Sequence, residues 1–585
     1  MIASLALTLT LRAPWLSRDN HVGLFGIDAP LARLPGGQFY LPGTLLVGRL
    51  AEAFDHLAQV ESKYGCAAAT FLPRNGMADI DAQGREARRR LFISDLALQG
   101  GAAGDGLRTR IAIDPASGTV ADGAMQVIEA PLAAGAEAQF AGTVRLLGTE
   151  NECRDMAAHL QKALRWLTQV GGGRTYGHGV VDEVSLGADK QQNTAAQPAE
   201  GQRLQLRITA HDPLCVGEKR TSPNSYQSSE VIAGGVIKGA LANTVLTGAG
   251  KTGPLDMAAR ELDELSDLAT NFSALHISHG FPVKKEKGNA RPSRAAFSIA
   301  QKDGSFADMA LLVDPEAPQL GWKFAPDWKD TVQEAFDALT GWSAPKTDFR
   351  IRTAIDKSHR AADEGRLFAI EYRRPDTHDW IAHVDVEGKA DAGKILAQLN
   401  LALKDGLAGV GRGGAYCSVA IAALAPQAAQ TVAKGDRLIL TLQTPALLRK
   451  PVPGATGDVT EGYRTAFSAI GLPGLKSIFI REQLHGGQFF AHRLPKGTAY
   501  KPWLLTRAGS CFVFEVGDGP PDLTSLARFG LAVPVATAEF YAPVLTNDAW
   551  KYCPYLPENG YGEVHLQVVK AGDLLKEPKV LKAWP

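Results

Sequence analysis

The segment GGGRTYGHG at residues 171–179 decides how the rest of the chain is interpreted. It follows a stretch in which apolar residues recur at helical spacing from Met156 to Leu167, which predicts an amphipathic helix leading into a glycine-rich loop. The same arrangement returns as GLAGVGRGG at residues 406–414 and as ENGYGEVHLQV from Glu558. Three glycine-rich loops at equivalent places indicate that the chain repeats one supersecondary unit.

The segments before each loop also match one another. A strand-like stretch opens each unit, and in the first two units a glycine turn and helix follow it, YLPGTLLVGRLAEAF at residues 40–54 and EVIAGGVIKGALAN at residues 230–243. Middle segments from Arg108 and from Ile351 predict inserted β-hairpins, and the third unit lacks one. The order of elements is that of a βαββαβ ferredoxin-like or RRM-like module: strand, helix, strands, helix, glycine loop and strand. We therefore expect an α+β chain with tandem modules at residues 1–186, 203–435 and 436–585 and an exposed linker at residues 187–202.

Composition narrows the function classes. The 585 residues are 45% hydrophobic and 21% charged, and no segment has the long uncharged apolar run of a membrane span. Lys plus Arg equals Asp plus Glu at 62 each, which excludes a protein that binds polyanions through bulk charge. Six scattered cysteines predict neither a zinc ribbon nor a disulfide framework. The start, MIASLALTLTL, lacks a basic region and predicts a first strand, so we expect a soluble protein in the cytoplasm.

Glycine-rich loops leave backbone N–H groups uncovered and let a phosphate or a base approach closely. In the first loop Arg174 can add a phosphate contact, and Tyr176 or His178 can stack on a base. Arg412 has the same place as Arg174 in the second loop. The glycines expected to contact RNA are Gly171, Gly172, Gly173, Gly409, Gly411, Gly413, Gly560 and Gly562. Short basic runs are more often solvated surface than binding sites; those present are Arg85 with Arg88, Arg89 and Arg90, Lys284 with Lys285 and Lys287, and Arg291 with Arg294.

Taken together, these pieces resemble the RAMP superfamily of CRISPR-associated proteins, which pairs a glycine turn and helix after the first strand with a glycine-rich loop before the last. GIDAP at residues 26–30, YLPGTLLVGRL at residues 40–50, LFISDLAL at residues 91–98 and the block at residues 108–131 resemble the type III backbone subunit. The second and third units resemble the RAMP protein of type III-D complexes, often grouped with the subunit that caps the guide's 5′ handle. A fusion of two backbone copies is the alternative. The resemblance implies guide RNA, target RNA and other type III effector subunits as partners.

The resemblance also implies site residues. Asp28 in GIDAP has the place of the family's target-cleaving aspartate, where it could hold a hydrated Mg²⁺ or Mn²⁺ or orient a 2′-hydroxyl for in-line attack. From the residues alone, Asp28 more simply caps a turn before Pro30. Lys238 matches a lysine that lies near the guide RNA in the family, and Arg49 is one residue beyond the corresponding position in the first unit.

Two other functions stay open. The chain could be an RNA-binding scaffold without nuclease activity, or a guide-processing endonuclease that uses a histidine, His21 or His178, as general acid and base. The second unit has no carboxylate where the first has Asp28, so we expect it to bind without cutting. Its nearest acid, Glu230, is expected to interact with the helix N-terminus. Specificity would come from base pairing with the guide, which would lie along all the modules, while the middle hairpins interrupt the duplex.

Overall fold

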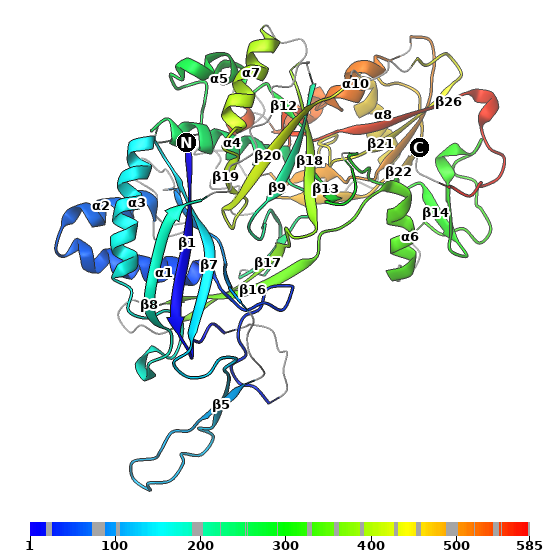
Figure 1. Cartoon of the computed structure of the whole chain (residues 1–585). Coiled ribbons are helices and arrows are strands. Elements are labelled where there is room, and N and C mark those ends of the chain that lie inside the picture. The colour runs from blue at the N-terminus through cyan, green and yellow to red at the C-terminus, as the bar shows by residue number, and fades with distance from the viewer. Residues whose placement is uncertain are drawn as a thin grey trace.

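The structure is a computed structural model of the whole chain (Figure 1). It describes residues 1–18, 26–72, 88–100, 106–189, 203–222, 224–251, 253, 255–288, 290–324, 330–355, 362–386, 391–425, 431–451, 458–486, 501–519, 521–541, 549–551 and 553–582. Three main sheets follow one another along the chain, and we call the units built on them the first, second and third modules.

The first module is built on the six-stranded sheet β2-β4-β7-β1-β8, with β3 also paired to β7. Leu7, Leu9 and Leu11 alternate with polar residues along β1 and point into the core under the helices. Thr149 and Glu152 form a capping box that starts α3. The elements are β1 (Ile2–Arg12), β2 (Tyr40–Leu41), α1 (Gly43–Ala58), α2 (Ser62–Phe71), β3 (Leu91–Ile93), β4 (Leu96–Leu98), β5 (Leu107–Arg110), β6 (Gln126–Glu129), β7 (Glu137–Leu147), α3 (Glu150–Arg165) and β8 (Val180–Ala188).

The second module has the sheet β12-β18-β9-β20-β19, with β13 also paired to β18, and a separate four-stranded sheet β10-β11-β17-β16. Trp380 is fully buried between the main sheet and its helices, and its Nε1 donates to the Glu230 carbonyl at 2.8 Å. The elements are β9 (Arg203–Ala210), β10 (Gly217–Ser222), β11 (Ser225–Ser228), α4 (Gly234–Gly248), α5 (Ser266–Asn271), β12 (His276–Ile277), β13 (Phe281–Lys284), β16 (Thr347–Ile355), β17 (Ala362–Arg373), β18 (His378–Asp385), α7 (Ala392–Leu403), β19 (Leu407–Val410) and β20 (Ala415–Ala423).

The third module has the sheet β22-β25-β21-β26 and a short ribbon of β23 and β24. Phe467 of α8 packs against Phe512 and Phe514 of β25, with ring centroids 4.6 and 5.1 Å away. The elements are β21 (Arg437–Leu442), α8 (Val459–Ala469), β22 (Leu475–Phe479), β23 (Glu482–His485), β24 (Trp503–Thr506), β25 (Cys511–Glu515), α10 (Leu523–Phe529), α11 (Val535–Tyr541) and β26 (Val564–Val569).

A segment that comes before β16 in sequence covers the other face of the third sheet. It contains β14 (Ile299–Lys302), β15 (Ser305–Asp308) and α6 (Asp330–Thr340). Ile299 and Phe306 of this segment share a buried cluster with Val513 of β25. Chain that lies within the predicted second module therefore packs on the third.

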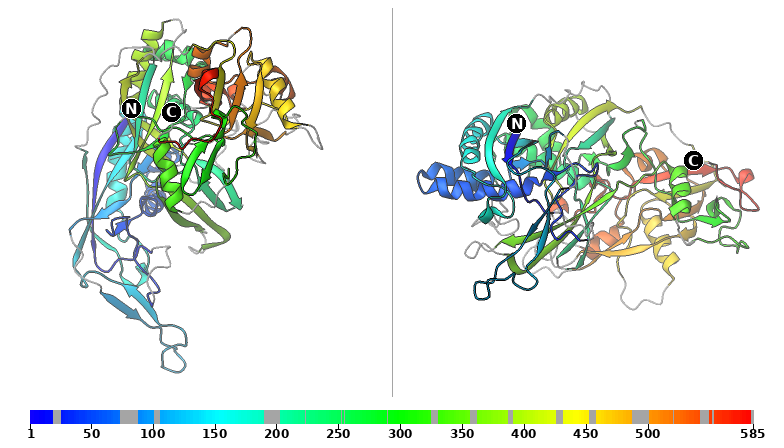
Figure 2. Two further views of the ribbon diagram at one scale, coloured as in Figure 1. Left: turned by 90° about the vertical axis from the view of Figure 1, so that its right-hand side faces the viewer. Right: turned by 60° about the horizontal axis from the view of Figure 1, so that its bottom comes forward.

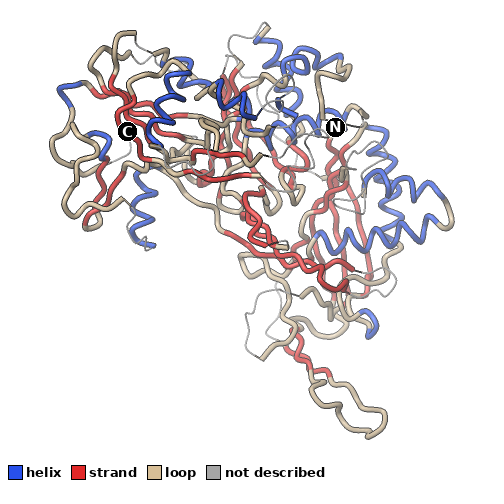
Figure 3. The backbone as a smooth tube through the Cα atoms, turned by 180° about the vertical axis from the view of Figure 1, so that it is seen from behind, coloured by secondary structure: helices blue, strands red, loops and turns tan. Residues whose placement is uncertain are grey.

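Each main sheet has the same strand order. Numbered by their order along the chain, the strands lie as fourth, first, third and second, which is the antiparallel order of a ferredoxin-like fold. The prediction of an α+β chain of repeated ferredoxin-like modules with inserted hairpins is thus confirmed. Figure 3 shows the same sheets and helices from behind.

The hairpin of β5 and β6 projects well away from the first module and ends in a long tip, as two further views show (Figure 2). The β16–β17 hairpin leaves the second module and runs along the first, where Arg350 of β16 pairs with Asp95 at 2.7 Å. Within the described ranges, no helix is long and apolar enough to cross a membrane.

Candidate functional site

The first glycine-rich loop lies between α3 and β8 and is pinned to the chain that leaves β1. The Gly172 N–H donates to the Leu16 carbonyl at 2.7 Å, and the Gly179 N–H donates to the Pro14 carbonyl at 2.8 Å. At Gly171 the φ angle is +100°, and a Cβ there would lie 2.6 Å from the Leu16 oxygen. Gly171 is therefore required for the close contact of this loop with the chain after β1.

Side chains of this loop meet the base of the β5–β6 hairpin. The Arg110 guanidinium lies 3.5 Å from the centroid of the Tyr176 ring, and Tyr176 is 43% exposed. The Tyr176 and His178 rings make an edge-to-face contact with centroids 5.2 Å apart. Burial lowers the pKa of His178, and the charges of Arg108 and Arg110 lower it further. Among the described residues, the buried Nδ1 of His178 has no hydrogen-bond partner.

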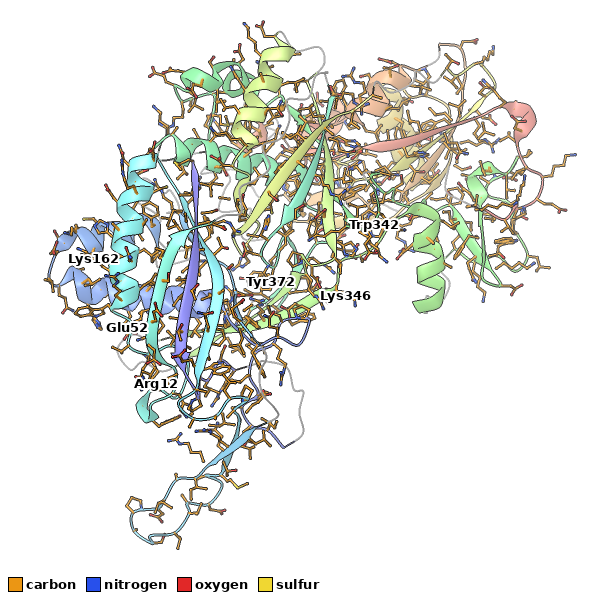
Figure 4. The ribbon with its side chains drawn as sticks, viewed as in Figure 1. Arg12, Glu52, Lys162, Trp342, Lys346 and Tyr372 are labelled. Atoms are coloured by element: carbon orange, nitrogen blue, oxygen red, sulfur yellow. The ribbon has the colours of Figure 1, made fainter. Side chains whose placement is uncertain are left out.

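Helix α1 supports the same loop from the other side. Arg49 Nε donates to the Gln169 carbonyl at 3.3 Å, and its guanidinium also pairs with Glu52 one turn along the helix. Arg174 of the loop lies 3.9 Å from the same Glu52 carboxylate, which Figure 4 labels on α1. The structure thus brings the predicted Arg49 and Arg174 together, although Glu52 neutralises part of their charge.

Asp28 is exposed and joined to the hairpin by hydrogen bonds. Its Oδ2 accepts from the Val127 N–H at 2.7 Å, and its own N–H donates to the Val127 carbonyl at 3.0 Å. Ala29 forms a parallel bridge with Ile128. The loop that carries Asp28 therefore runs as a short extra strand along β6.

Buried Glu129 at the end of β6 holds the continuation of this loop. One carboxylate oxygen accepts from the Leu31 N–H at 2.8 Å, and the other pairs with Arg33. Glu129 is 4% exposed, and these partners satisfy both oxygens of its buried carboxylate. The carboxylate of Asp28 is consequently fixed relative to the hairpin rather than placed on a free loop.

Within the part of the chain that the structure describes, Asp28 does not belong to a preformed metal site. Among the described residues no group of three or more His, Cys, Asp or Glu side chains could hold a metal ion. A single exposed carboxylate fits a hydrated Mg²⁺ or Mn²⁺ only when other oxygens, such as those of an RNA phosphate, complete the coordination.

The second glycine-rich loop packs partly against the first module. A Cβ at Gly414 would lie 3.2 Å from the Phe92 ring of β3, and one at Gly409 would lie 3.4 Å from Asn243 of α4. The Arg412 N–H donates to the Cys215 carbonyl at 2.7 Å. Its exposed guanidinium lies 3.7 Å from the centroid of the Tyr226 ring. Arg412 therefore points outward while the glycines on either side contact protein.

The third loop is covered by the second module. Gly560 and Gly562 are buried, and a Cβ at Gly560 would lie 2.7 Å from the His279 nitrogen. A Cβ at Gly562 would lie 2.9 Å from the Leu531 oxygen. In this arrangement the close approach that both glycines permit is to protein backbone, which argues against the predicted RNA contacts at these two positions.

For Lys238 and Glu230 the structure shows surroundings that differ from those predicted from the sequence. Lys238 is 7% exposed, and its ammonium donates to the Ser273 carbonyl at 3.1 Å, so it faces protein here. Glu230 accepts from Trp342 Nε1 at 3.1 Å rather than from the helix N-terminus, because the indole reaches its carboxylate from the chain before β16. Hydrogen bonding to an aromatic partner 112 residues away leaves no local sequence signal.

The basic runs are dispersed. Arg90 pairs with Glu152, and Arg291 pairs with Glu563, whereas Arg294 lies 3.5 Å from the centroid of the Trp342 ring. Arg85 and His21 lie outside the described residues. The sequence analysis missed Arg108 and Arg110 as partners of the first loop. The Arg-x-Arg spacing that puts both on one face of a strand was the available signal.

Comparison with known proteins supplies a family. The sequence model described as the RAMP superfamily matches residues 20–182, and the model described as CRISPR-associated protein (Cas_Cmr3) matches residues 322–519. The first range includes Asp28 and the first glycine loop. No curated protein matches the chain.

Solved structures of a type III-B complex align weakly. Cmr-beta bound to cognate target RNA and AMPPnP aligns with 13% identity and a TM-score of 0.29, over 53% of this chain and 86% of that one. Cmr-beta bound to cognate target RNA aligns with 8% identity and a TM-score of 0.23, over 32% and 61%. These scores are too low to add to the two family matches, which lie on successive modules of one RAMP-like fold. Over these two ranges the chain is similar to the RAMP superfamily and to the CRISPR-associated protein Cas_Cmr3.

Proposed function

We propose that the chain binds a guide RNA along its modules and cleaves the paired target RNA at Asp28. The observation that carries this proposal is the place of Asp28, which is exposed and hydrogen-bonded to β6 at the base of the projecting hairpin. The glycine loop with Tyr176 contacts the same hairpin through Arg110. A nucleic acid held on this loop would therefore pass close to the carboxylate.

Local charge supports RNA binding where bulk charge does not. Arg108, Arg110 and Arg174 gather around the first loop, although the whole chain carries no formal net charge. Guanidinium groups bind phosphates and stack on bases, and both contacts serve single-stranded RNA. Affinity should accordingly fall with rising salt.

The residues on the face of the first sheet opposite its helices indicate that RNA would contact the loops of the module rather than its strands. Thr8, Gln139 and Thr143 alternate with the core residues and lie on the face away from the helices. An RRM that stacks bases on its sheet presents aromatic residues there. Near Leu147 the same face is covered by the second module, where Arg145 lies 4.1 Å from the centroid of the Tyr416 ring. Because the rest of the face carries short polar side chains, we assign the RNA to the glycine loop and hairpin instead.

The hairpin tip has the composition of a segment that inserts between bases. Ile111, Ile113 and Met125 are 47%, 53% and 63% exposed. Apolar side chains held away from any core are costly in water and favour contact with unstacked bases. The hairpin would displace a target nucleotide and leave its phosphate near Asp28.

Asp28 would act on that phosphate in one of two ways. Its carboxylate could hold a hydrated divalent cation together with RNA oxygens, or it could orient the adjacent 2′-hydroxyl. In-line attack by the 2′-oxygen forms a 2′,3′-cyclic phosphate and releases the 5′-oxygen of the next nucleotide as a hydroxyl. Displacement of the target base helps because free rotation of the backbone is needed for this alignment.

The second and third modules would hold the guide without cutting. The second module lacks a carboxylate at the position of Asp28, and the Cas_Cmr3 match, to residues 322–519, covers parts of both. This second match favours a distinct RAMP protein, such as one that caps the guide's 5′ handle, over a second copy of the first module. Other type III subunits would complete the assembly.

The test uses the assembled complex with guide RNA and a labelled complementary target, with Mg²⁺, with Mn²⁺ and with chelator. Asp28→Ala and Asp28→Asn should lower the cleavage rate at least about 100-fold, because the positioned carboxylate is lost. The matched control is Asp122→Asn, an exposed carboxylate on the same hairpin, which should cut normally. Guide and target affinity should change less than about twofold in all three variants.

Three results would contradict the proposal in different ways. Normal cutting by Asp28→Ala would remove Asp28 from the chemistry. A wild-type complex that binds but never cuts the target would favour a scaffold. Metal-independent cutting of precursor guide that is lost in His178→Ala would favour a processing enzyme.

A further inference from the structure

The junction of the first two modules contains a group of cations and a tyrosine that the proposed cleavage site does not use. Arg89 lies two residues before β3, whose Phe92 packs on Gly414 of the second glycine loop. Arg352 lies on β16 and Tyr372 on β17, the hairpin that the second module extends along the first. Figure 4 labels Tyr372 in this region, between the first sheet and the second.

The three side chains are neighbours. The Arg352 guanidinium lies 5.6 Å from the centroid of the Tyr372 ring. Arg89 is close enough to both for their charges to act on it: burial lowers the pKa of Arg89 most, and the like charge of Arg352 lowers it further. Both arginines are partly exposed. Since a guanidinium keeps its proton in proteins, two like charges are held together at a partly desolvated place.

The acids nearby are already paired with other arginines. Arg350 forms ion pairs with Asp95 at 2.7 Å and with Asp348 at 3.2 Å. Glu371 lies 3.0 Å from Arg373. Among the described residues, Arg89 and Arg352 have no ion pair with a carboxylate. An anion from outside the chain would relieve their repulsion.

Tyr372 adds an independent sign of a missing ligand. The residue is 2% exposed, and its buried hydroxyl has no hydrogen-bond partner among the described residues. Leaving a buried hydroxyl unpaired costs about 1–3 kcal/mol, so such groups usually have a partner. The glycine loop packs directly on this ring, because a Cβ at Gly413 would lie 3.1 Å from it. The unpaired hydroxyl, the two cations and the loop therefore belong to one place.

We propose that Arg89, Arg352 and the Tyr372 hydroxyl form a seat for one phosphate group at the junction of the first and second modules. The ligand is a backbone phosphodiester of the guide RNA, so the inference rests on the proposed function and assigns the RNA a point of contact between modules. Two guanidiniums supply charge-assisted hydrogen bonds, and the phenol donates a third. Arg412, exposed at the edge of the same loop, would contact the next nucleotide.

The test measures binding of a single-stranded RNA of guide length to the full chain at several salt concentrations. Arg89→Gln and Arg352→Gln should each weaken binding about tenfold and reduce the slope of log Kd against log salt by up to about 0.7, the share of one phosphate. Tyr372→Phe removes only the hydroxyl and should weaken binding about threefold without changing the slope. Arg89→Lys should keep most of the slope.

The matched control is Arg464→Gln, an exposed arginine that pairs with Glu461 on α8 and should leave affinity and slope unchanged. Thermal unfolding of each variant separates a folding defect from a binding defect. Because Tyr372→Phe and Arg89→Lys preserve volume or charge, they keep the test valid if a glutamine variant fails to fold.

Inorganic phosphate separates the two sources of the ligand and the two proposals. If phosphate alone raises the Tm of the wild type but not of Arg89→Gln, while the wild type binds no RNA, the seat stands and the proposed function fails. If RNA binds the wild type but the glutamine variants keep its affinity and slope, the seat is wrong although the chain binds RNA.

Discussion

The first and third glycine-rich loops have equivalent places in their modules and opposite surroundings. In the first loop Tyr176 is 43% exposed and Gly177, at φ +84°, has open space where a Cβ would be. In the third loop Gly560, at φ +80°, is buried against the backbone of the second module. Two glycines with the same backbone conformation thus differ only in what lies next to them.

The difference shows that a glycine-rich loop indicates close packing by another group but does not identify that group. In the third module the approaching group is the turn after β12, so the loop serves the contact between modules. The second loop is intermediate, because its glycines touch Phe92 and Asn243 while Arg412 remains outside. The first loop contacts the chain after β1 and the β5–β6 hairpin of its own module, and it keeps Tyr176 exposed.

The largest effect should come from the charges around the covered loop. Arg291 pairs with Glu563 beside the third loop and donates to the His279 carbonyl at 2.8 Å. Arg291→Ala should lower the free energy of unfolding by about 3–5 kcal/mol, because it leaves a half-buried carboxylate without its partner. Arg12→Ala, at the exposed Arg12–Asp182 pair near the open loop, should cost under about 1 kcal/mol. Urea unfolding of the full chain measures both, and equal losses would erase the distinction.

The glycines themselves provide a matched pair. Gly560→Ala should lower the free energy of unfolding by about 2–4 kcal/mol, since the strained φ adds to an overlap with backbone 2.7 Å away. Gly177→Ala carries only the strain, about 1 kcal/mol. Thermal unfolding of the two variants is the measurement. A Gly177 variant as unstable as the Gly560 variant would mean that the open loop is also packed in solution.

Acid should act on the covered loop more than on the open one. Burial lowers the pKa of His279 to about 3, and its ring contacts Tyr561 of the third loop with centroids 4.6 Å apart. With a folded pKa below the ordinary value of about 6.5, stability is full above pH 6.5 and is lost as pH falls toward 3. The loss attributable to His279 should reach about 2 kcal/mol at pH 5.

Replacing the ring tests that assignment. His279→Phe keeps the edge-to-face contact and cannot be protonated, so its unfolding free energy should change less than that of the wild type between pH 8 and pH 5. His178→Phe in the open loop should alter the pH dependence less, because His178 is less buried. If His279→Phe keeps the full pH dependence, other groups carry it.

The smallest effect on stability should accompany a clear effect on binding. Tyr176→Ala in the open loop should change the free energy of unfolding by under about 1 kcal/mol, as the ring is largely exposed. Loss of one stacked base should weaken binding of single-stranded RNA about tenfold. Tyr555→Ala, whose ring is 5% exposed just before the third loop, should do the reverse. Fluorescence anisotropy with labelled RNA compares the two.

Sequence patterns predicted the repeated units because the order of helices and strands within each module follows from local patterns of residues. The glycine turn at Gly43 and Gly234, the alternation in β1, and the helix leading into Gly171 each depend on neighbouring residues. Such signals survive without tertiary information. The hairpins were predicted for the same reason.

Contacts between modules could not be predicted in this way. Nothing near Lys238 shows that its ammonium will meet the Ser273 carbonyl, and nothing near Ile299 shows that it will pack on the third sheet. The pairing of Tyr176 with Arg110 joins two elements that are distant in sequence. These environments depend on packing between segments that are distant in the sequence. Such packing cannot be predicted from the pattern of a single sequence.

If the chain cleaves target RNA at Asp28 as proposed, the attachment of Asp28 to β6 bears on where the target is cut. Because the carboxylate and the hairpin share backbone hydrogen bonds, tilting the hairpin would carry the carboxylate with it. The angle of the hairpin would then determine which nucleotide of the target is cut. Shortening its tip would leave the cut at the same nucleotide, whereas changing its angle at the Glu129 end would shift the cut along an unchanged guide.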